Sequence, residues 1–176
     1  MAERAEVVFV DGVRTPFGRA GEKGMFWNNR ADDLVVKAMI GLLERNPQIP
    51  QDRYDDVAIA ATTQQGDQGL TLGRTAALLA GLPKSVPGYA IDRMCAGAMT
   101  SVTTIAGAIA FGAYDIGIAG GVEHMGRHPM GFGADPNPRF LAEKLVSADA
   151  LNMGNTAERI HDRFPQLTKE RADRFA

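Results

Sequence analysis

Cysteine is nearly missing from this sequence: its 176 residues include only one, Cys95. A single cysteine excludes an intrachain disulfide, which fits a reducing compartment. The opening stretch, MAERAEVVFVDG, also lacks the apolar core and the small-residue cleavage pattern of a signal peptide. We therefore expect a cytoplasmic protein.

An excess of basic residues is missing too. The 19 Lys and Arg residues stand against 21 Asp and Glu residues, which gives a formal net charge of −2. No segment is polybasic. This balance argues against nucleic acid and against an anionic membrane surface as partners.

Phosphate and metal motifs are equally scarce. The glycine-rich stretch GDQGLTLGR lacks the spacing and the Lys-Ser/Thr pair of a phosphate-binding loop. His124 and His128 stand four residues apart, a spacing that suits zinc only on a helix, and Gly126 and Pro129 argue against a helix there. We expect no bound metal.

The sequence has one long run without charged residues, between Arg93 and Asp115. The run is long enough to span a bilayer, but it is rich in Thr and Gly and has few bulky apolar residues. We expect a small-residue helix buried inside a soluble protein, covered on all sides, and no membrane span.

The remaining sequence alternates between strand and helix patterns. Short β-branched runs predict strands at 6–14, 54–64, 88–93 and 115–125, and apolar residues at helical spacing predict helices at 30–47, within 65–83 and at 94–114. Such alternation predicts an α/β fold, a mostly parallel sheet with helices on both faces. Functional sites in such sheets gather beyond the carboxyl ends of the strands.

The character changes after Met125. A loop rich in Gly and Pro is followed by helix patterns at 137–145, 152–164 and 168–176, with Thr168 as a candidate N-cap of the last one. No strand pattern is found in this tail. We expect one α/β domain at 1–125 and the start of a second region at 126–176.

Cys95 is the candidate nucleophile, because it follows a predicted strand and opens a predicted helix. The positive end of a helix and its free N–H groups favour a thiolate and an oxyanion. Free cysteines are more often buried packing residues, however, and on the residues alone we favour packing. A nucleophilic cysteine also needs a base, and none of the histidines, at 124, 128 and 161, has a sequence context that identifies it as one.

Five stretches, taken in order, resemble the thiolase family. They are DGVRTPFGR, IDRMCAGA, AGGVEHMGRHPMG, NMGNTAERI and LTKERADRFA. Together they resemble the N-terminal part of a degradative 3-ketoacyl-CoA thiolase, and most of all the thiolase subunit of an actinobacterial fatty-acid oxidation multienzyme complex. The resemblance covers essentially the whole chain and reverses the preference for packing at Cys95.

The resemblance implies a thiolase-like three-layer fold and a role for two residues. Cys95 would be the nucleophile that accepts the acyl group, with its own backbone N–H in the oxyanion hole, and Met153 would line the pantetheine and acyl pocket. The reaction would be cleavage of a 3-ketoacyl-CoA by CoA in fatty-acid β-oxidation, or its reverse. CoA and acyl-CoA would be substrates, with no bound cofactor. The assembly would be a homodimer or higher oligomer, with a hydratase/dehydrogenase α subunit as a candidate partner.

The sequence departs from the family pattern at three places. Asp92 stands where Asn is usual, Gly97-Ala98 where Ser-Gly is usual, and His124 where Ser is usual. The carboxylate of Asp92 could oppose a thiolate at Cys95 by like-charge repulsion, or it could pair with Arg93 or Arg74.

Thiolases also have a second, similarly folded domain, which supplies two catalytic histidines and an acid/base cysteine. We expect these outside residues 1–176, which alone would be inactive. Two other hypotheses stay open: a non-catalytic acyl-CoA-binding or assembly subunit, and a condensing enzyme of the ketoacyl synthase type.

Overall fold

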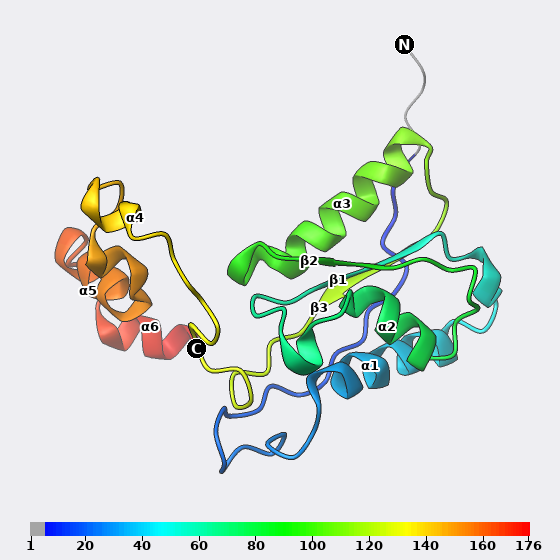
Figure 1. The fold of residues 1–176 in the computed structure, drawn as a ribbon, viewed down its shortest axis with the longest axis horizontal. Helices are drawn as coiled ribbons and strands as arrows, with labels where there is room; N and C mark the ends of the chain where they lie inside the picture. Colours follow the sequence, from blue (N-terminus) through cyan, green and yellow to red (C-terminus); the bar gives the residue numbers. More distant parts are fainter. Residues whose placement is uncertain (1–5) are drawn as a thin grey trace. The chain divides into compact units, whose positions relative to one another are not determined.

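A computed structural model describes residues 6–176, and its three strands form one parallel sheet (Figure 1). The strands are β1 (Asp56–Ala60), β2 (Tyr89–Ile91) and β3 (Gly117–Gly121), in the order β2-β1-β3. β1 is central, and all five of its residues are buried. A parallel strand covered on both faces is mostly apolar, and the apolar residues at 57–60 made this strand recognisable in the sequence.

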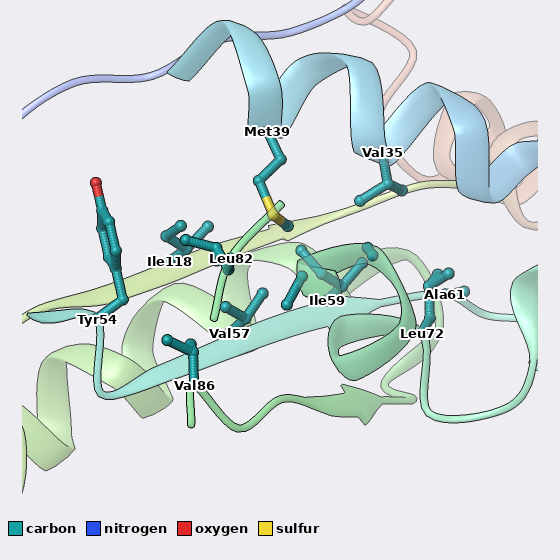
Figure 2. Close-up of a cluster of buried hydrophobic side chains, with 12 residues drawn as sticks. Val35, Met39, Tyr54, Val57, Ile59, Ala61, Leu72, Leu82, Val86 and Ile118 are labelled. Carbon is teal, nitrogen blue, oxygen red and sulfur yellow. The ribbon is translucent and has the colours of Figure 1, made fainter. Parts of the chain in front are cut away.

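Two helices cover one face of the sheet. They are α1 (Ala31–Arg45) and α2 (Leu72–Leu79). Figure 2 shows Val35 and Met39 of α1 pointing toward Val57, Ile59 and Ile118 of the sheet. Burying each such side chain stabilises the fold by about 2 kcal/mol.

A third helix, α3 (Gly97–Phe111), covers the other face, so the predicted α/β arrangement with helices on both faces is confirmed (Figure 1). A short 3₁₀ turn, η3 (Met94–Ala96), precedes it. The sheet presents small residues to α3, and a Cβ added at Gly117 would lie 2.6 Å from Ile105. The absence of side chains there allows the helix to approach the strands closely.

The prediction that this helix is covered on all sides is wrong for the part of the chain that the structure describes. Gly97, Ser101 and Ile105 are buried, one stripe at a spacing of four residues. Phe111 is 89% exposed. The sheet lies on one side of the helix, so it can bury only one stripe.

The segment Met94–Phe111 is long and apolar enough to cross a membrane by length and composition. Core helices of soluble proteins pass the same test, so this property does not decide where the helix lies.

The predicted strand at 6–14 is also wrong: these residues form no strand. Val8 and Phe9 are 67% and 84% exposed. A hollow of about 510 Å³ lies between residues 9–20, α1 and the end of β3. A strand needs a ladder of hydrogen bonds to a neighbour, and apolar composition alone does not provide one.

Glycines in the left-handed region follow two of the predicted helices. Gly81 (φ +93°) follows α2, and Gly112 (φ +82°) caps α3. Beyond Gly112, the hydroxyl of Tyr114 donates to Asp56 Oδ2 at 2.7 Å. This bond ties the end of α3 to the start of β1. The short 3₁₀ turns η1 (Gln51–Arg53) and η2 (Gly66–Gln68) lie in the connections.

The chain divides into two compact units, the first ending at Gly133 and the second spanning Ala134–Ala176. The second unit holds α4 (Arg139–Ala142), η4 (Ala148–Leu151), α5 (Met153–Arg163) and α6 (Lys169–Phe175). The predicted domain boundary at 125/126 falls slightly earlier and stays a prediction.

Two helices of the second unit, α5 and α6, begin at side-chain caps. Thr168 accepts a hydrogen bond from Arg171 N, which confirms it as an N-cap, and Asn152 accepts from Gly154 N at 2.9 Å. No residue of the unit is buried. Local bonds of this kind therefore contribute much of the order within it.

Candidate functional site

Cys95 lies where the sequence places it, at the carboxyl edge of the parallel sheet. The chain leaves β2 at Ile91, turns through η3 and enters α3 at Gly97. Cys95 is the middle residue of that turn, and its side chain is exposed. A thiol that faces solvent at the start of a 15-residue helix is accessible to a substrate, and packing does not account for it.

The backbone before Cys95 is strained. Met94 has φ +49°, in the left-handed region that side chains other than glycine rarely adopt. Asp92 Oδ1 accepts a hydrogen bond from Met94 N at 3.0 Å, and Ala96 N donates to Arg93 O at 3.1 Å. These two bonds close the turn around Cys95 and hold Met94 in its unusual conformation.

Asp92 therefore has a role that neither alternative from the sequence included. Its carboxylate caps the turn, and the ion pairs among residues 6–176 do not include it. The guanidinium of Arg74 is engaged elsewhere, by Val86 O and, at 3.0 Å, by Lys84 O. An acceptor oxygen is what this position requires, and both Asp and the usual Asn provide one.

Gly97 and Ala98 seat the turn against the ends of two strands. A Cβ added at Gly97 would lie 2.8 Å from Ala60 Cβ, closer than real Cβ atoms come. A Cβ added at Gly121 would lie 3.0 Å from Ala98 Cβ. The departure from Ser at position 97 thus has a steric reason in this chain.

His124 is not a base for Cys95, because both of its ring nitrogens are engaged. Nε2 lies 2.8 Å from Phe26 O, which can only accept, so Nε2 carries the proton. Nδ1 accepts from Arg127 N at 3.2 Å. The ring is buried and links the loop after β3 to the loop before α1.

His128 belongs to a buried cluster with Asp67. Its Nε2 contacts Asp67 Oδ1, and Arg127 Nε lies 2.8 Å from Asp67 Oδ2. Ala31 N donates to the same carboxylate at 3.2 Å. Burial would raise the pKa of Asp67, but the hydrogen bonds of His128 and Ala31 and the charge of Arg127 outweigh it and lower that pKa. The cluster is a structural link between loops.

The third histidine and Met153 lie in the second unit. His161 Nδ1 contacts Leu167 O. Met153 opens α5 and is 54% exposed, so it is accessible to a ligand. Its predicted place in a pantetheine pocket stays a prediction. Residues 6–176 contain no cluster of three or more His, Cys, Asp or Glu that could hold a metal ion.

A network around Gln68 was not predicted. This side chain is fully buried, its Nε2 donates to Thr63 O at 2.8 Å and to Glu123 Oε1 at 2.9 Å, and its Oε1 accepts from His124 N at 2.7 Å. Glutamine is common in surface loops, so its residue type did not point to a buried network. The only signal for Gln68 was its position after a predicted strand.

Comparison with known proteins decides the family. A profile described as the thiolase N-terminal domain matches residues 7–176. The chain belongs to the thiolase family. Similar relatives are the 3-ketoacyl-CoA thiolase of Idiomarina loihiensis, 39% identical over 170 residues, and that of Pseudoalteromonas translucida, 43% identical over 169 residues. A third, from Aliivibrio salmonicida, is 40% identical over 170 residues.

These thiolase matches cover nearly all of this chain but less than half of each relative. The Idiomarina alignment spans 97% of the chain and 43% of the relative, and the Pseudoalteromonas alignment spans 96% and 42%. The matches favour the thiolase interpretation over a ketoacyl synthase. They place the described α/β unit, with Cys95, in the N-terminal domain of the family.

Proposed function

We propose that the protein carrying this chain is an acyltransferase that cleaves 3-ketoacyl-CoA with CoA, through an acyl group on Cys95. The observation that carries the proposal is the exposed thiol on the strained turn between β2 and α3, within a thiolase N-terminal domain. The printed names of the relatives, 3-ketoacyl-CoA thiolase, support the substrate class.

The first step forms the acyl-enzyme. The Cys95 thiolate attacks the C3 carbonyl of the substrate, and the resulting oxyanion collapses with cleavage of the C2–C3 bond. The bond electrons pass to C2, which takes up a proton, and acetyl-CoA leaves. The shortened acyl chain stays on the sulfur as a thioester.

The second step releases the acyl group. The thiolate of a new CoA attacks the thioester carbonyl, the bond to Cys95 Sγ breaks, and a shortened acyl-CoA leaves. The same steps in reverse give Claisen condensation. No redox change occurs, so CoA and acyl-CoA are substrates and no cofactor is needed.

The start of α3 supports both steps electrostatically. Cys95 lies directly before α3, and the positive end of the helix dipole favours the transient oxyanion that forms there. The backbone N–H of Cys95 is proposed as one oxyanion donor. The proton donors and acceptors are proposed to lie outside residues 1–176, because both ring nitrogens of His124 are engaged and His128 is in the Asp67 cluster.

The wider context follows from the family and is also proposed. Met153 contributes to the pantetheine and acyl pocket. The proposed pathway is fatty-acid β-oxidation in the cytoplasm. The proposed assembly is a homodimer or higher oligomer, with a hydratase/dehydrogenase α subunit as the candidate partner, as in an actinobacterial complex.

Mass spectrometry of the full-length protein tests the nucleophile. After incubation with an acyl-CoA, we expect one acyl adduct on the peptide that contains Cys95, and none in the Cys95→Ala variant. An adduct that survives this substitution would contradict the proposal. Met99→Leu, a substitution on the exposed surface of α3, is the control and should keep the adduct.

One observation favours a second candidate, a non-catalytic acyl-CoA-binding or assembly subunit. Among the described residues, every histidine side chain contacts groups other than Cys95. Calorimetry and turnover assays on the full-length protein separate the two functions. Tight CoA binding without thiolysis would support the subunit, whereas thiolysis that depends on Cys95 would support the enzyme.

A further inference from the structure

Gln68 joins three loops at the carboxyl edge of the sheet. It ends η2, and its amide bonds to Thr63 O after β1 and to Glu123 and His124 after β3. The amide orientation is determined by these partners. A flipped amide would set its oxygen against two acceptors, Thr63 O and Glu123 Oε1, and its NH₂ group against a donor, His124 N.

The loop that Gln68 holds begins at the end of β1, and residues there contact both sides of the Cys95 turn. Upstream of the cysteine, Ile91 O accepts from Ala61 N at 3.1 Å. Downstream, Gly97 packs against Ala60. The end of β1 therefore sets the positions of both ends of the turn that carries the thiol.

Glu123 completes the link on the other side of β1. Its Oε2 accepts from Thr62 N at 2.7 Å, and Val122 N donates to Ala60 O at 2.9 Å. Glu123 is exposed, whereas Gln68 is fully buried. Water can replace the bonds of an exposed carboxylate, but it cannot replace those of a buried amide without rearrangement.

We infer that Gln68 is a positioning residue for Cys95, holding the end of β1 so that the thiol meets the acyl carbonyl in the reactive geometry. The inference rests on the proposed function. It assigns Gln68 no contact with substrate. Small displacements of a reacting atom cost up to about 100-fold in rate, so loss of this bridge should be visible in catalysis.

The first test replaces the amide with a side chain of similar length and no hydrogen-bonding capacity. In the full-length Gln68→Met variant, we expect acylation of Cys95 by acyl-CoA to be about tenfold slower than in the wild type. Alkylation of Cys95 by iodoacetamide, which needs no oriented carbonyl, should change less than about twofold. In steady state, kcat should fall while KM stays near its wild-type value.

Two measurements separate positioning from loss of folding. The exposed Gln51, which lies before β1 at the opposite end of the strand, is the matched control, and Gln51→Met should acylate at the wild-type rate. Circular dichroism of the Gln68→Met variant should match the wild type. A partly unfolded variant would instead show faster alkylation of the cysteine.

A second variant supplies a pH signature. Gln68→Glu places a carboxylate beside Glu123 and Thr63 O with no proton to donate. Like charges favour uptake of one proton as the pH falls, and a protonated carboxyl can donate one of the two hydrogen bonds that the amide donated, which restores part of the bridge. The acylation rate relative to wild type should therefore rise from about pH 8 to about pH 5.

The outcomes distinguish this inference from the proposed function. If the wild type shows no acyl adduct on Cys95, both are overturned. If the wild type is acylated and Gln68→Met is acylated equally fast, only the inference is overturned. A rate ratio for Gln68→Glu that is independent of pH would also overturn it.

Discussion

The carboxylate of Asp92 lies 3.0 Å from the backbone nitrogen of Met94 and holds that residue at φ +49°, directly before Cys95. An acidic residue near a proposed thiolate is therefore used as a backbone cap. The same bond can be made by the side-chain oxygen of Asn, which is usual at this position in the family.

This relationship predicts different effects of two substitutions at Asp92. Asp92→Asn keeps the acceptor oxygen, so acylation of Cys95 should stay within about twofold of wild type. Asp92→Ala removes it and frees the strained turn, so acylation should slow by about tenfold. Single-turnover mass spectrometry measures both rates. Equal losses in the two variants would show that the charge of Asp92 is what matters.

The contact between Gly97 and Ala60 predicts a penalty for the usual family residue. Gly97→Ser adds a Cβ only 2.8 Å from Ala60 Cβ and should lower the free energy of unfolding by about 1 to 3 kcal/mol. Ala60→Gly in the same molecule removes the clash. Urea denaturation of both single variants and the double variant should show strong non-additivity. Additive effects would mean that positions 97 and 60 are not coupled, and would contradict the clash.

The Asp67 cluster predicts a dependence of stability on acid pH. The pKa of Asp67 is lowered from 3.8, so its contribution is complete above about pH 4 and is lost as the pH falls through the lowered value. Asp67→Asn should cost about 2 kcal/mol at neutral pH. The difference from wild type should shrink in acid.

Chemical denaturation at several pH values measures the Asp67 effect. Asp162→Asn, on the exposed surface of α5, is the control and should leave stability nearly unchanged. A deficit of Asp67→Asn that stays constant into acid would contradict the assignment, because it would not come from the ionised carboxylate.

The hydrogen bond of Tyr114 predicts that the stability of the folded protein falls at alkaline pH. The bond to Asp56, aided by burial, raises the pKa of Tyr114 from 10.0 to about 12. The folded protein then binds the phenol proton more tightly than the unfolded chain, so stability falls between about pH 10 and about pH 12. Tyr114→Phe should lose about 1 kcal/mol at neutral pH. Ultraviolet titration should show that the phenol ionising near pH 12 is absent in this variant, and its persistence would contradict the assignment.

The proposed place of Met153 in the pantetheine pocket predicts that its substitution weakens substrate binding and leaves the chemistry at Cys95 unchanged. If it lines the pantetheine pocket, Met153→Ala should raise KM for acyl-CoA several-fold, about 1 kcal/mol of lost apolar contact, and leave the site of acylation at Cys95 unchanged. Leu145, an exposed apolar residue of the same unit, offers the control Leu145→Ala. Unchanged kinetics in Met153→Ala would remove Met153 from the binding site.

Much of the fold could be predicted because the relevant signals are local. The apolar residues of β1, the helical spacing of α1 and the placement of Cys95 between strand and helix are properties of short stretches. The segment at 6–14 has the same local signal as β1 and forms no strand in the structure. Pairing depends on a neighbour, and the composition of the segment carries no information about one.

The sequence by itself determined the α/β class, the candidate nucleophile at Cys95 and membership in the thiolase family. The tertiary structure decided what the neighbouring polar residues do. Asp67 and His128 are 61 residues apart in the chain, and Gln68 and Glu123 are 55 apart, yet each pair is in contact. Hydrogen-bond partners of this kind are set by the packing of loops at the sheet edge, so no pattern within a single stretch could reveal them.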